Sequence, residues 1–513
     1  MTAADTAAPI TLDGSTLTPE TLARIARERA PVVLAASARE RIAAGRRVVE
    51  RALASAQPVY GLTTGLGDRV GERLPDEVLQ GFSFDVVRGR AMATGEALPA
   101  DLVRALMVVR LNTLATGGSG ASPAVAEQLL AVLAAGLVPE MPEIGSCGAS
   151  DLCVMAHLGL ALIGEGAFLD DRGRPAPAAE VLERHGLAPL ALAPKDGLAL
   201  CSNSAFSAAR SALALCDAAR ALESAQTIAA LSMEGFRANP SPLDPRAGTA
   251  RPQPGQQRAA AGLLARLAGA GLLEPGAARR LQDPLSLRCL AATHGGGYFA
   301  LDRLRAALEP ELNGAGDNPL VLAADDAILA TGNFQLPAVT VALDGLGQAL
   351  AHVAVASAGR CARLLAARHS GLPANLSPHW PNGSGLAPLF KPAEALLAEI
   401  RHDAATTPAE LSLGADGVED TLVNAPLAAR KLGRLVENLE RLLAIEAVIA
   451  AQAVDLAGVH ALLGPTTAEA QRIVRGVVPP LDTDRSLSGP LRELTERVIR
   501  SGALARAGEE QPG

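Results

Sequence analysis

Apolar residues recur at helical spacing over long stretches of the second half of the chain. Three runs of roughly thirty residues, 205–235, 338–367 and 427–453, carry apolar side chains at intervals of three and four and contain no proline. The second and third runs each follow a proline, Pro337 and Pro426, which suits the first turn of a helix. Helices of this length exceed the usual globular length and predict a helical bundle.

In the first 200 residues the runs of apolar residues at helical spacing are shorter and are interrupted more often. Segments 31–55, 101–114 and 123–136 predict helices, separated by Gly-rich stretches at 61–67 and 117–120 that predict loops. We therefore expect an all-α protein in two parts. An irregular region, 1–204, would carry the candidate chemistry, and 205–513 would form the bundle of long helices and further C-terminal helices.

Composition narrows the class of protein. Hydrophobic residues make up 49% and charged residues 19% of the chain, which predicts a folded protein, and aromatic residues are only 2%, so Ala, Leu and Val must build the core. The net charge is -8 without a Lys/Arg-dense stripe, which argues against a nucleic-acid partner. The six cysteines form no C-x-x-C pair and the histidines no H-x-x-x-H pair, so we expect no metal site.

Targeting and membrane signals are not evident in the pattern. The first residues lack a basic segment followed by an apolar one, which is the form of a secretory leader. Apolar stretches are too short to span a bilayer or carry charged residues. We expect no membrane partner and a cytoplasmic location.

Tyr60 opens a Gly-rich stretch that reads YGLTTGLG, and it is one of only two tyrosines in the chain. A tyrosine on such a loop can approach a substrate closely, and a nearby cation or donor makes its hydroxyl a candidate general base. A buried tyrosine in a turn is the alternative interpretation.

Residues 138–157 read VPEMPEIGSCGASDLCVMAH. This stretch resembles the signature of the histidine, phenylalanine and tyrosine ammonia-lyases, G-S-x-G-A-S-G-D-L. In that family the Ala-Ser-Gly triad cyclises by itself and loses two waters to form methylidene-imidazolone (MIO), an electrophile that accepts the substrate amine. Other segments resemble further family motifs in the same order along the chain: 60–67, 110–120, 195–200, 251–256, 282–288, 311–319, 332–334 and 419–420.

The resemblance implies a fold, an assembly and roles for individual residues. It implies the all-helical fold of the ammonia-lyase/fumarase superfamily, a small-molecule substrate and a homotetramer whose sites are each built from three chains. Tyr60 matches the general base and Arg288 the anchor of the substrate carboxylate, which a guanidinium holds with two parallel hydrogen bonds. Phe334 and Glu419 match residues that line the pocket, and Asn318 a structural or binding asparagine. Each of three residues also has a plain alternative. Arg288 could form an ordinary helix salt bridge, Phe334 could be a core aromatic, and Glu419 could be a solvated acid.

The triad itself departs from the family pattern. Asp151 follows Ala149 and Ser150 directly, so the triad glycine is missing. Ring closure needs a sharp backbone bend that glycine permits and a residue with a Cβ opposes. Formation of MIO is therefore doubtful, and we expect no other cofactor. Ser146-Cys147-Gly148 is a second triad that ends in glycine, with a thiol in place of the hydroxyl, but it lies three residues too early.

Other candidate substrate contacts are altered as well. Leu285 replaces a tyrosine, and Ser202 stands where the family has an asparagine, with Asn203 one step further on. The family positions that select the substrate side chain correspond to Val86 and Val87 in this chain. The resemblance therefore implies a substrate that is more apolar than histidine.

Three functions remain open at this point. The first is a lyase-family enzyme without MIO that uses Tyr60 for acid–base chemistry in an elimination, an isomerisation, or a conjugate addition with cyclisation. Its substrate would be small and fairly apolar and would bear a carbonyl or carboxylate. The second is an MIO-dependent ammonia-lyase or aminomutase that acts on an aromatic or related amino acid. The third is a non-catalytic relative that binds a ligand.

Overall fold

The computed structural model describes residues 8–55, 58–71, 73–379 and 382–508. The chain is mostly helical, with 61% helix and few strands, as the sequence predicts. It divides into two compact units. Unit 1 comprises 1–216, 305–341 and 407–430, and unit 2 comprises 217–304, 342–406 and 431–513. The structure thus groups residues differently from the consecutive segments 1–204 and 205–513, because two later segments pack with the N-terminal region.

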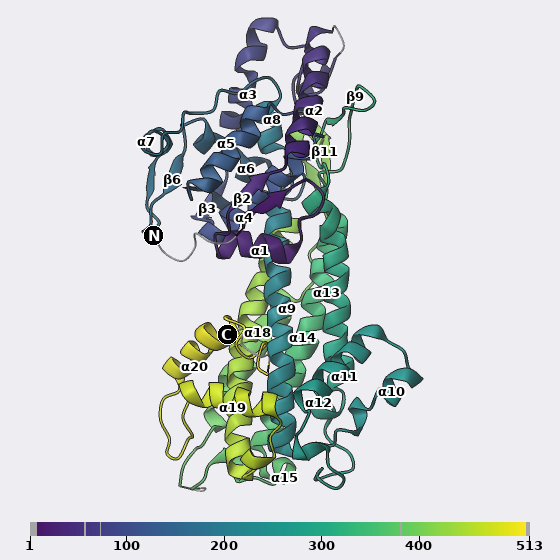
Figure 1. Ribbon diagram of the computed structural model, residues 1–513, viewed down its shortest axis with the longest axis vertical. Helices are drawn as coiled ribbons and strands as arrows, with labels where there is room; N and C mark the ends of the chain where they lie inside the picture. The colour runs from purple at the N-terminus through teal and green to yellow at the C-terminus, as the bar shows by residue number, and fades with distance from the viewer. Residues whose placement is uncertain (1–7, 56–57, 72, 380–381, 509–513) are drawn as a thin grey trace. The chain divides into compact units, whose positions relative to one another are not determined.

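Unit 1 is built around α4 (Ala100–Leu114), in which every residue from Leu102 to Leu114 is buried. Helices α1 (Pro19–Arg27) and α5 (Pro123–Ala134) pack against α4. Helices α3 (Asp76–Arg90), α6 (Leu152–Leu162) and α8 (Asp196–Cys201) pack against one another. These elements form the purple and blue part of Figure 1. Helix α7 (Ala178–Arg184) completes this part of unit 1.

Five small sheets lie among the described residues of unit 1. β1 (Ile10–Leu12) pairs in parallel with β2 (Val32–Leu34), and β3 (Thr94–Ala97) pairs with β5 (Pro142–Ile144). The other three sheets join β4 (Val138–Pro139), β6 (Ala167–Leu169) and β7 (Pro175–Pro177); β8 (Leu320–Leu322) and β9 (Ala327–Leu329); and β10 (Glu410–Leu413) and β11 (Glu419–Leu422). The helix predicted at 31–55 accordingly starts later, as α2 (Ala36–Ala54), because Val32 to Leu34 pair with β1.

Four long helices contribute residues to both units: α9 (Ala205–Phe236), α13 (Leu290–Asn313), α14 (Pro337–Leu365) and α18 (Ala425–Ala457). Helices α9, α14 and α18 confirm the three long helices predicted from the sequence. In unit 2 they are joined by a buried ion pair, in which Arg360 of α14 donates to Glu446 of α18 at 2.6 Å, and Ser232 of α9 donates to the same carboxylate. Figure 1 shows these helices side by side.

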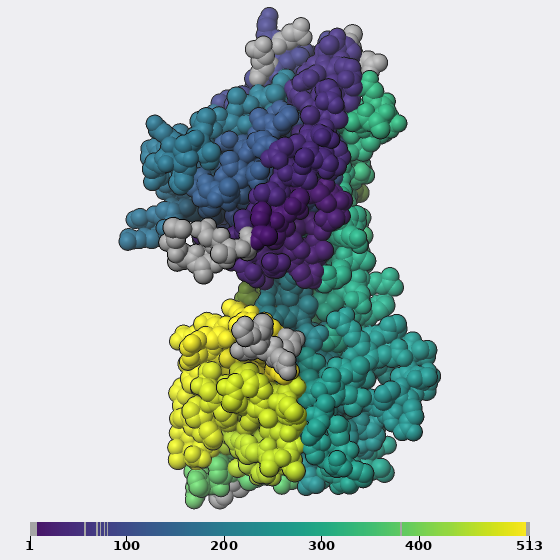
Figure 2. All heavy atoms as spheres, in the orientation of Figure 1, coloured from purple at the N-terminus to yellow at the C-terminus, as the bar shows by residue number. Residues whose placement is uncertain are grey.

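Shorter elements surround the bundle in unit 2. They are α10 (Pro245–Ala250), α11 (Pro254–Arg266), α12 (Leu285–Arg288), α15 (Ala367–Ser370), α16 (Phe390–Asp403), α19 (Pro465–Val477) and α20 (Ser488–Leu494). A π-helical turn, Thr495–Ile499, follows α20 directly. The C-terminal helices of this unit form the yellow block in Figure 2.

One helix among the described residues, α14, is long and apolar enough to cross a membrane by length and composition. Only 44% of its apolar window is buried within this chain. Core helices of water-soluble proteins pass the same test, so this feature is weak evidence for a membrane.

Candidate active site

The signature loop, Gly145 to Asp151, lies in unit 1 in a tightly turned conformation. Gly148 has φ +91° and Ser150 has φ +60°, a left-handed value that is unusual for a residue with a side chain. Gly148 and Ser150 form a bridge, and Ala149 pairs with Gln335. A Cβ on Gly148 would lie 2.8 Å from the Val423 side chain, so a larger residue does not fit there. The loop is therefore held from both sides by later segments of the chain.

Asp151 anchors the end of this loop. Its backbone amide donates to the carbonyl oxygen of Asn203 at 2.7 Å. Its carboxylate accepts from the amide and hydroxyl of Ser207, at 2.8 and 2.7 Å, and from the hydroxyl of Ser146 at 2.7 Å. Burial raises the pKa of this carboxyl, and the hydrogen bonds from Ser207 and Ser146 oppose that rise. Both the amide and the side chain of Asp151 are thus fully engaged.

Ser150 and Ser202 meet across the site. Their hydroxyl oxygens are 3.3 Å apart, and only 5% of Ser150 is exposed while Ser202 is half-buried. Asn203, one position further, turns its amide inward and donates to the carbonyl of Leu200 at 2.9 Å. Ser202 is therefore the residue that faces the triad, and Asn203 closes the end of α8.

Tyr60 lies on a turn that packs against two other parts of unit 1. Its hydroxyl oxygen accepts from the backbone amide of Gly67 at 3.2 Å. A Cβ on Gly61 would lie 2.7 Å from the Leu198 side chain of α8, and one on Gly67 would lie 3.4 Å from Ala415. The turn thus lies between α8, which leads to Ser202, and the segment that precedes Glu419.

Phe334 and Glu419 belong to the segments that hold the signature loop. The backbone carbonyl of Phe334 accepts from the hydroxyl of Ser204 at 2.7 Å, and the side-chain amide of Gln335 donates to the backbone carbonyl of Thr421 at 3.1 Å. Phe334 is half-buried, and Glu419, at the start of β11, is exposed. The structure brings both residues to the edge of the loop.

A polar cavity of about 420 Å³ adjoins this group. Its wall includes Asn203, Ser204 and Gln335 together with Arg110 and Glu311. The Nε of Arg110 is buried without a hydrogen-bond partner. Burial alone raises the pKa of the Glu311 carboxyl to about 7, so this group titrates near neutrality.

A buried ion pair supports the cavity. Arg110 donates to Asp317 at 2.8 Å, and both side chains are almost fully buried. The side-chain oxygen of Asn318, the next residue, accepts from the amide of Thr331 at 3.0 Å. Asn318 therefore holds the loop that carries Phe334, and a contact with substrate stays a prediction.

Val86 and Val87 lie in the packing of α3. They are 2% and 0% exposed, and a Cβ on Gly159 of α6 would lie 2.9 Å from the Val87 side chain. Neither side chain reaches the surface, so contact with a substrate stays a prediction for both.

Leu285 and Arg288 lie in unit 2, on α12. Leu285 is 62% exposed, and Arg288 donates to the side-chain oxygen of Gln282 at 2.6 Å. The structure places them in a different unit from Tyr60 and Ser150, and their part in the same site stays a prediction.

Two ionisable groups near the site have pKa values that are shifted by burial. The sequence pattern did not single them out. Glu311 is one, and its only sequence signal is the E-L-N string that it opens. Lys195 is the other: it is fully buried, and its ammonium donates to the carbonyls of Ser119 and Pro319. Burial lowers the pKa of Lys195 to about 8.

The model of the family described as aromatic amino acid lyase matches residues 17–476. The chain belongs to this family. It is 39% identical over 509 residues to a histidine ammonia-lyase from Anaeromyxobacter dehalogenans, with 96% of this chain and 99% of the relative covered. It is also 36% identical to a tyrosine ammonia-lyase from Cupriavidus metallidurans, with 97% of each chain covered. Aromatic amino acid lyases are enzymes, and this chain is a lyase-family enzyme.

Solved structures of family members have the same fold. The ergothionase from Treponema denticola superimposes with a TM-score of 0.92 at 28% identity, covering 97% of this chain and 99% of that one. The tyrosine aminomutase from Streptomyces globisporus does so with a TM-score of 0.91 at 32% identity, covering 98% of both. The family resemblance and fold predicted from the sequence are thus confirmed.

Proposed function

We propose that this lyase-family enzyme works without the imidazolone and uses Tyr60 for acid–base chemistry. The hydrogen bond from the Asp151 amide to Asn203 carries the proposal. This amide nitrogen is the atom that would have to attack the carbonyl of Ala149, and its hydrogen is committed to another acceptor at 2.7 Å. The Asp151 side chain is held by three further hydrogen bonds, which oppose the backbone rotation that ring closure requires. Ala149, Ser150 and Asp151 therefore do not fit the ring-forming triad.

Tyr60 supplies the base in this proposal. The backbone amide of Gly67 donates to its oxygen at 3.2 Å and so orients the phenol ring. The phenolate oxygen takes a proton from the carbon beside a carbonyl or carboxylate, and the resulting electron pair expels a leaving group or shifts a double bond. The same hydroxyl returns the proton in the reverse direction. Elimination, isomerisation, and conjugate addition with cyclisation all follow from this step.

The substrate in this proposal is small and fairly apolar and bears a carbonyl or carboxylate. The apolar residue Leu285, at a position where the resemblance implies a substrate contact, supports this choice. Arg288 would hold the carboxylate through two parallel hydrogen bonds.

We also propose that the chain assembles as a homotetramer in which other copies bring Arg288 and Leu285 to the Tyr60 loop. Large apolar side chains that are exposed in one chain support this assembly, because burial against another copy would remove them from water. These include Leu285 at 62%, Val341 at 72% and Phe299 at 47% exposed.

An MIO-dependent ammonia-lyase or aminomutase is the second candidate. The named activities of the relatives favour it, and so does the retained Ala149-Ser150 pair. A ligand-binding relative without catalysis is a third candidate, against which the Tyr60 turn and its Gly67 hydrogen bond argue.

Two matched variants distinguish the candidates. Wild type, Tyr60→Phe and Ser150→Ala are assayed on aromatic and aliphatic amino acids and on the corresponding unsaturated acids, with release or uptake of ammonia and loss of the double bond as readouts. We expect Tyr60→Phe to lower kcat by about a hundredfold or more with KM little changed. We expect Ser150→Ala to keep most of the activity, since no ring is made from it. Loss of activity in Ser150→Ala with intact folding would instead favour the MIO enzyme, and absence of turnover in wild type would favour the ligand-binding relative.

A further inference from the structure

A second large cavity lies within unit 2 and shares no residue with the candidate active site. Its volume is about 670 Å³, which is in the range of small-molecule sites. It is walled by α16, α18 and α20 and by the segment that leads into α20. Its apolar lining includes Leu386, Leu389, Leu396, Ile445, Leu487 and Leu491.

The charged residues of this wall are mostly cationic. Four arginines line it, Arg441, Arg485, Arg492 and Arg500, against two acids, Asp484 and Glu496. The carboxylate of Asp484 is already used, because it accepts from the backbone amides of Ser384 and Gly385 at 2.7 and 3.1 Å.

Two of these arginines, Arg485 and Arg492, lie in this wall without a close carboxylate partner among the described residues. Arg485 donates to the carbonyls of Pro480 and Pro479, at 3.0 and 2.5 Å, and neither Arg485 nor Arg492 forms an ion pair with a described residue. A guanidinium that meets only carbonyls or solvent retains its attraction for an anion.

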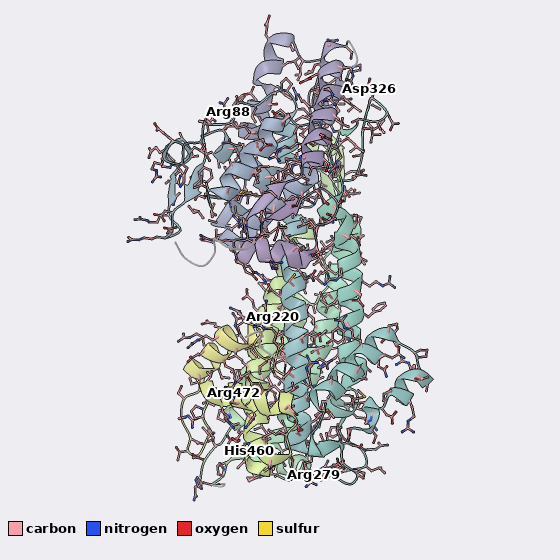
Figure 3. All side chains as sticks on the ribbon, in the orientation of Figure 1. Arg88, Arg220, Arg279, Asp326, His460 and Arg472 are labelled. Atoms are coloured by element: carbon pink, nitrogen blue, oxygen red, sulfur yellow. The ribbon has the colours of Figure 1, made fainter. Side chains whose placement is uncertain are left out.

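The other two arginines are tied to carboxylates of α18. Arg500 donates to Glu440 at 2.8 Å, and Glu440 also holds Arg220, which is labelled in Figure 3. One terminal nitrogen of Arg500 is buried without a hydrogen-bond partner, and Glu437 is 3.9 Å from it. These ion pairs fix the cationic side of the wall in place.

The wall also contains the π-helical turn after α20. Thr495 and Glu496 belong to this turn and line the cavity. Single π-helical turns are less stable than α-helix and are frequent at functional sites. The turn is thus a second feature of the same wall that points to binding.

We propose that this cavity binds a small amphipathic carboxylate. The apolar part of the ligand lies against the leucines, and its carboxylate is attracted by Arg485 and Arg492. The proposal is independent of the chemistry at Tyr60 because the two sites share no residue.

Decanoate is the probe, and decanol, which has the same chain length without the charge, is its matched control. Both are titrated by calorimetry into the full-length purified protein. We expect decanoate to bind at least about tenfold more tightly than decanol, as charge-assisted hydrogen bonds predict. Arg492→Gln should raise the Kd of decanoate about fivefold or more, and Leu396→Trp, which fills the cavity, should abolish binding.

Arg497→Gln is the matched protein control. Arg497 lies on the same turn but outside the lining; its side chain is 77% exposed and pairs with Glu493. The Kd of the Arg497→Gln variant for decanoate should therefore equal that of wild type. Equal binding of decanoate and decanol, or unchanged binding in Leu396→Trp, would overturn the proposal. No binding by wild type would also overturn it; if Leu491→Glu then changed the sedimentation of the protein, the cavity would be an interface between copies.

Discussion

The backbone amide of Asp151 donates to the carbonyl oxygen of Asn203 at 2.7 Å. This contact ties the end of the signature loop to the segment that follows α8. The loop is one residue shorter than the family pattern, and the proposed function treats the Asp151 amide as a structural donor and not as the nitrogen that closes a ring.

Restoring the missing residue tests this reading of the loop. With a glycine inserted between Ser150 and Asp151, the Asp151 amide keeps its hydrogen bond to Asn203. The nitrogen of the new, flexible glycine is then available for ring closure. We expect the insertion variant to lose two waters by mass spectrometry. Insertion of valine at the same place is the control. Ring formation in the valine variant would show that ring closure does not depend on the flexibility of glycine.

Removal of the Asp151 carboxylate should destabilise unit 1. Asp151→Ala leaves the buried amide of Ser207 without its acceptor at 2.8 Å, which costs about 1–3 kcal/mol for an unsatisfied buried donor. Chemical denaturation measures this loss. Asp420→Ala, at an exposed acid of β11, is the control and should leave the denaturation midpoint unchanged. A stable Asp151→Ala variant would show that Asp151 does not anchor the loop.

Glu311 should make stability depend on pH near neutrality. Burial raises the pKa of this carboxyl in the folded state from 4.5 to about 7, so its unfavourable ionisation begins as pH rises toward 7. The neutral carboxyl contributes fully to the stability of the folded state below pH 4.5, and this contribution is lost as pH rises through 7. We expect Glu311→Gln to raise the melting temperature at pH 8 and to change it little at pH 5. Glu309→Gln, at an exposed position of α13, is the control, and an equal effect of both variants would contradict the assignment.

The buried pair Arg360 and Glu446 should matter more than any surface pair. Both side chains are 0% exposed, so Arg360→Met leaves an unpaired buried carboxylate and should lower the free energy of unfolding by about 3–5 kcal/mol. Arg472→Gln breaks an exposed pair with Glu469 and should leave stability unchanged within error (Figure 3). Similar losses in the two variants, measured by denaturation, would contradict this ranking.

Much of the bundle could be predicted because it depends on local periodicity. Helices α9, α14 and α18 follow from apolar spacing and from prolines at the start of two of them. Helix α13 was not singled out, because it contains the run Gly295 to Gly297, which local rules treat as a helix breaker. The structure explains the first of these glycines: a Cβ on Gly295 would lie 2.5 Å from the backbone of Gln256, so tertiary packing requires a glycine there.

The candidate site was predictable only where a motif marked it. The Tyr60 turn, Ser150 and Ser202 were singled out from motif order. The structure places the two serine hydroxyls 3.3 Å apart, and their part in a site stays a prediction. The burial of Val87 against Gly159 could not be predicted, because it depends on how α3 meets α6. The raised pKa of Glu311 was missed for the same reason, since it arises from surrounding groups that are distant in the sequence.

The intact mass of the purified wild-type protein, with a peptide map over residues 149–151, tests the central claim most directly. The account predicts the mass of the unmodified chain and an ordinary Ala-Ser-Asp peptide. A mass lower by two waters, with the loss located in that peptide, would contradict the account and establish that the imidazolone forms without the triad glycine.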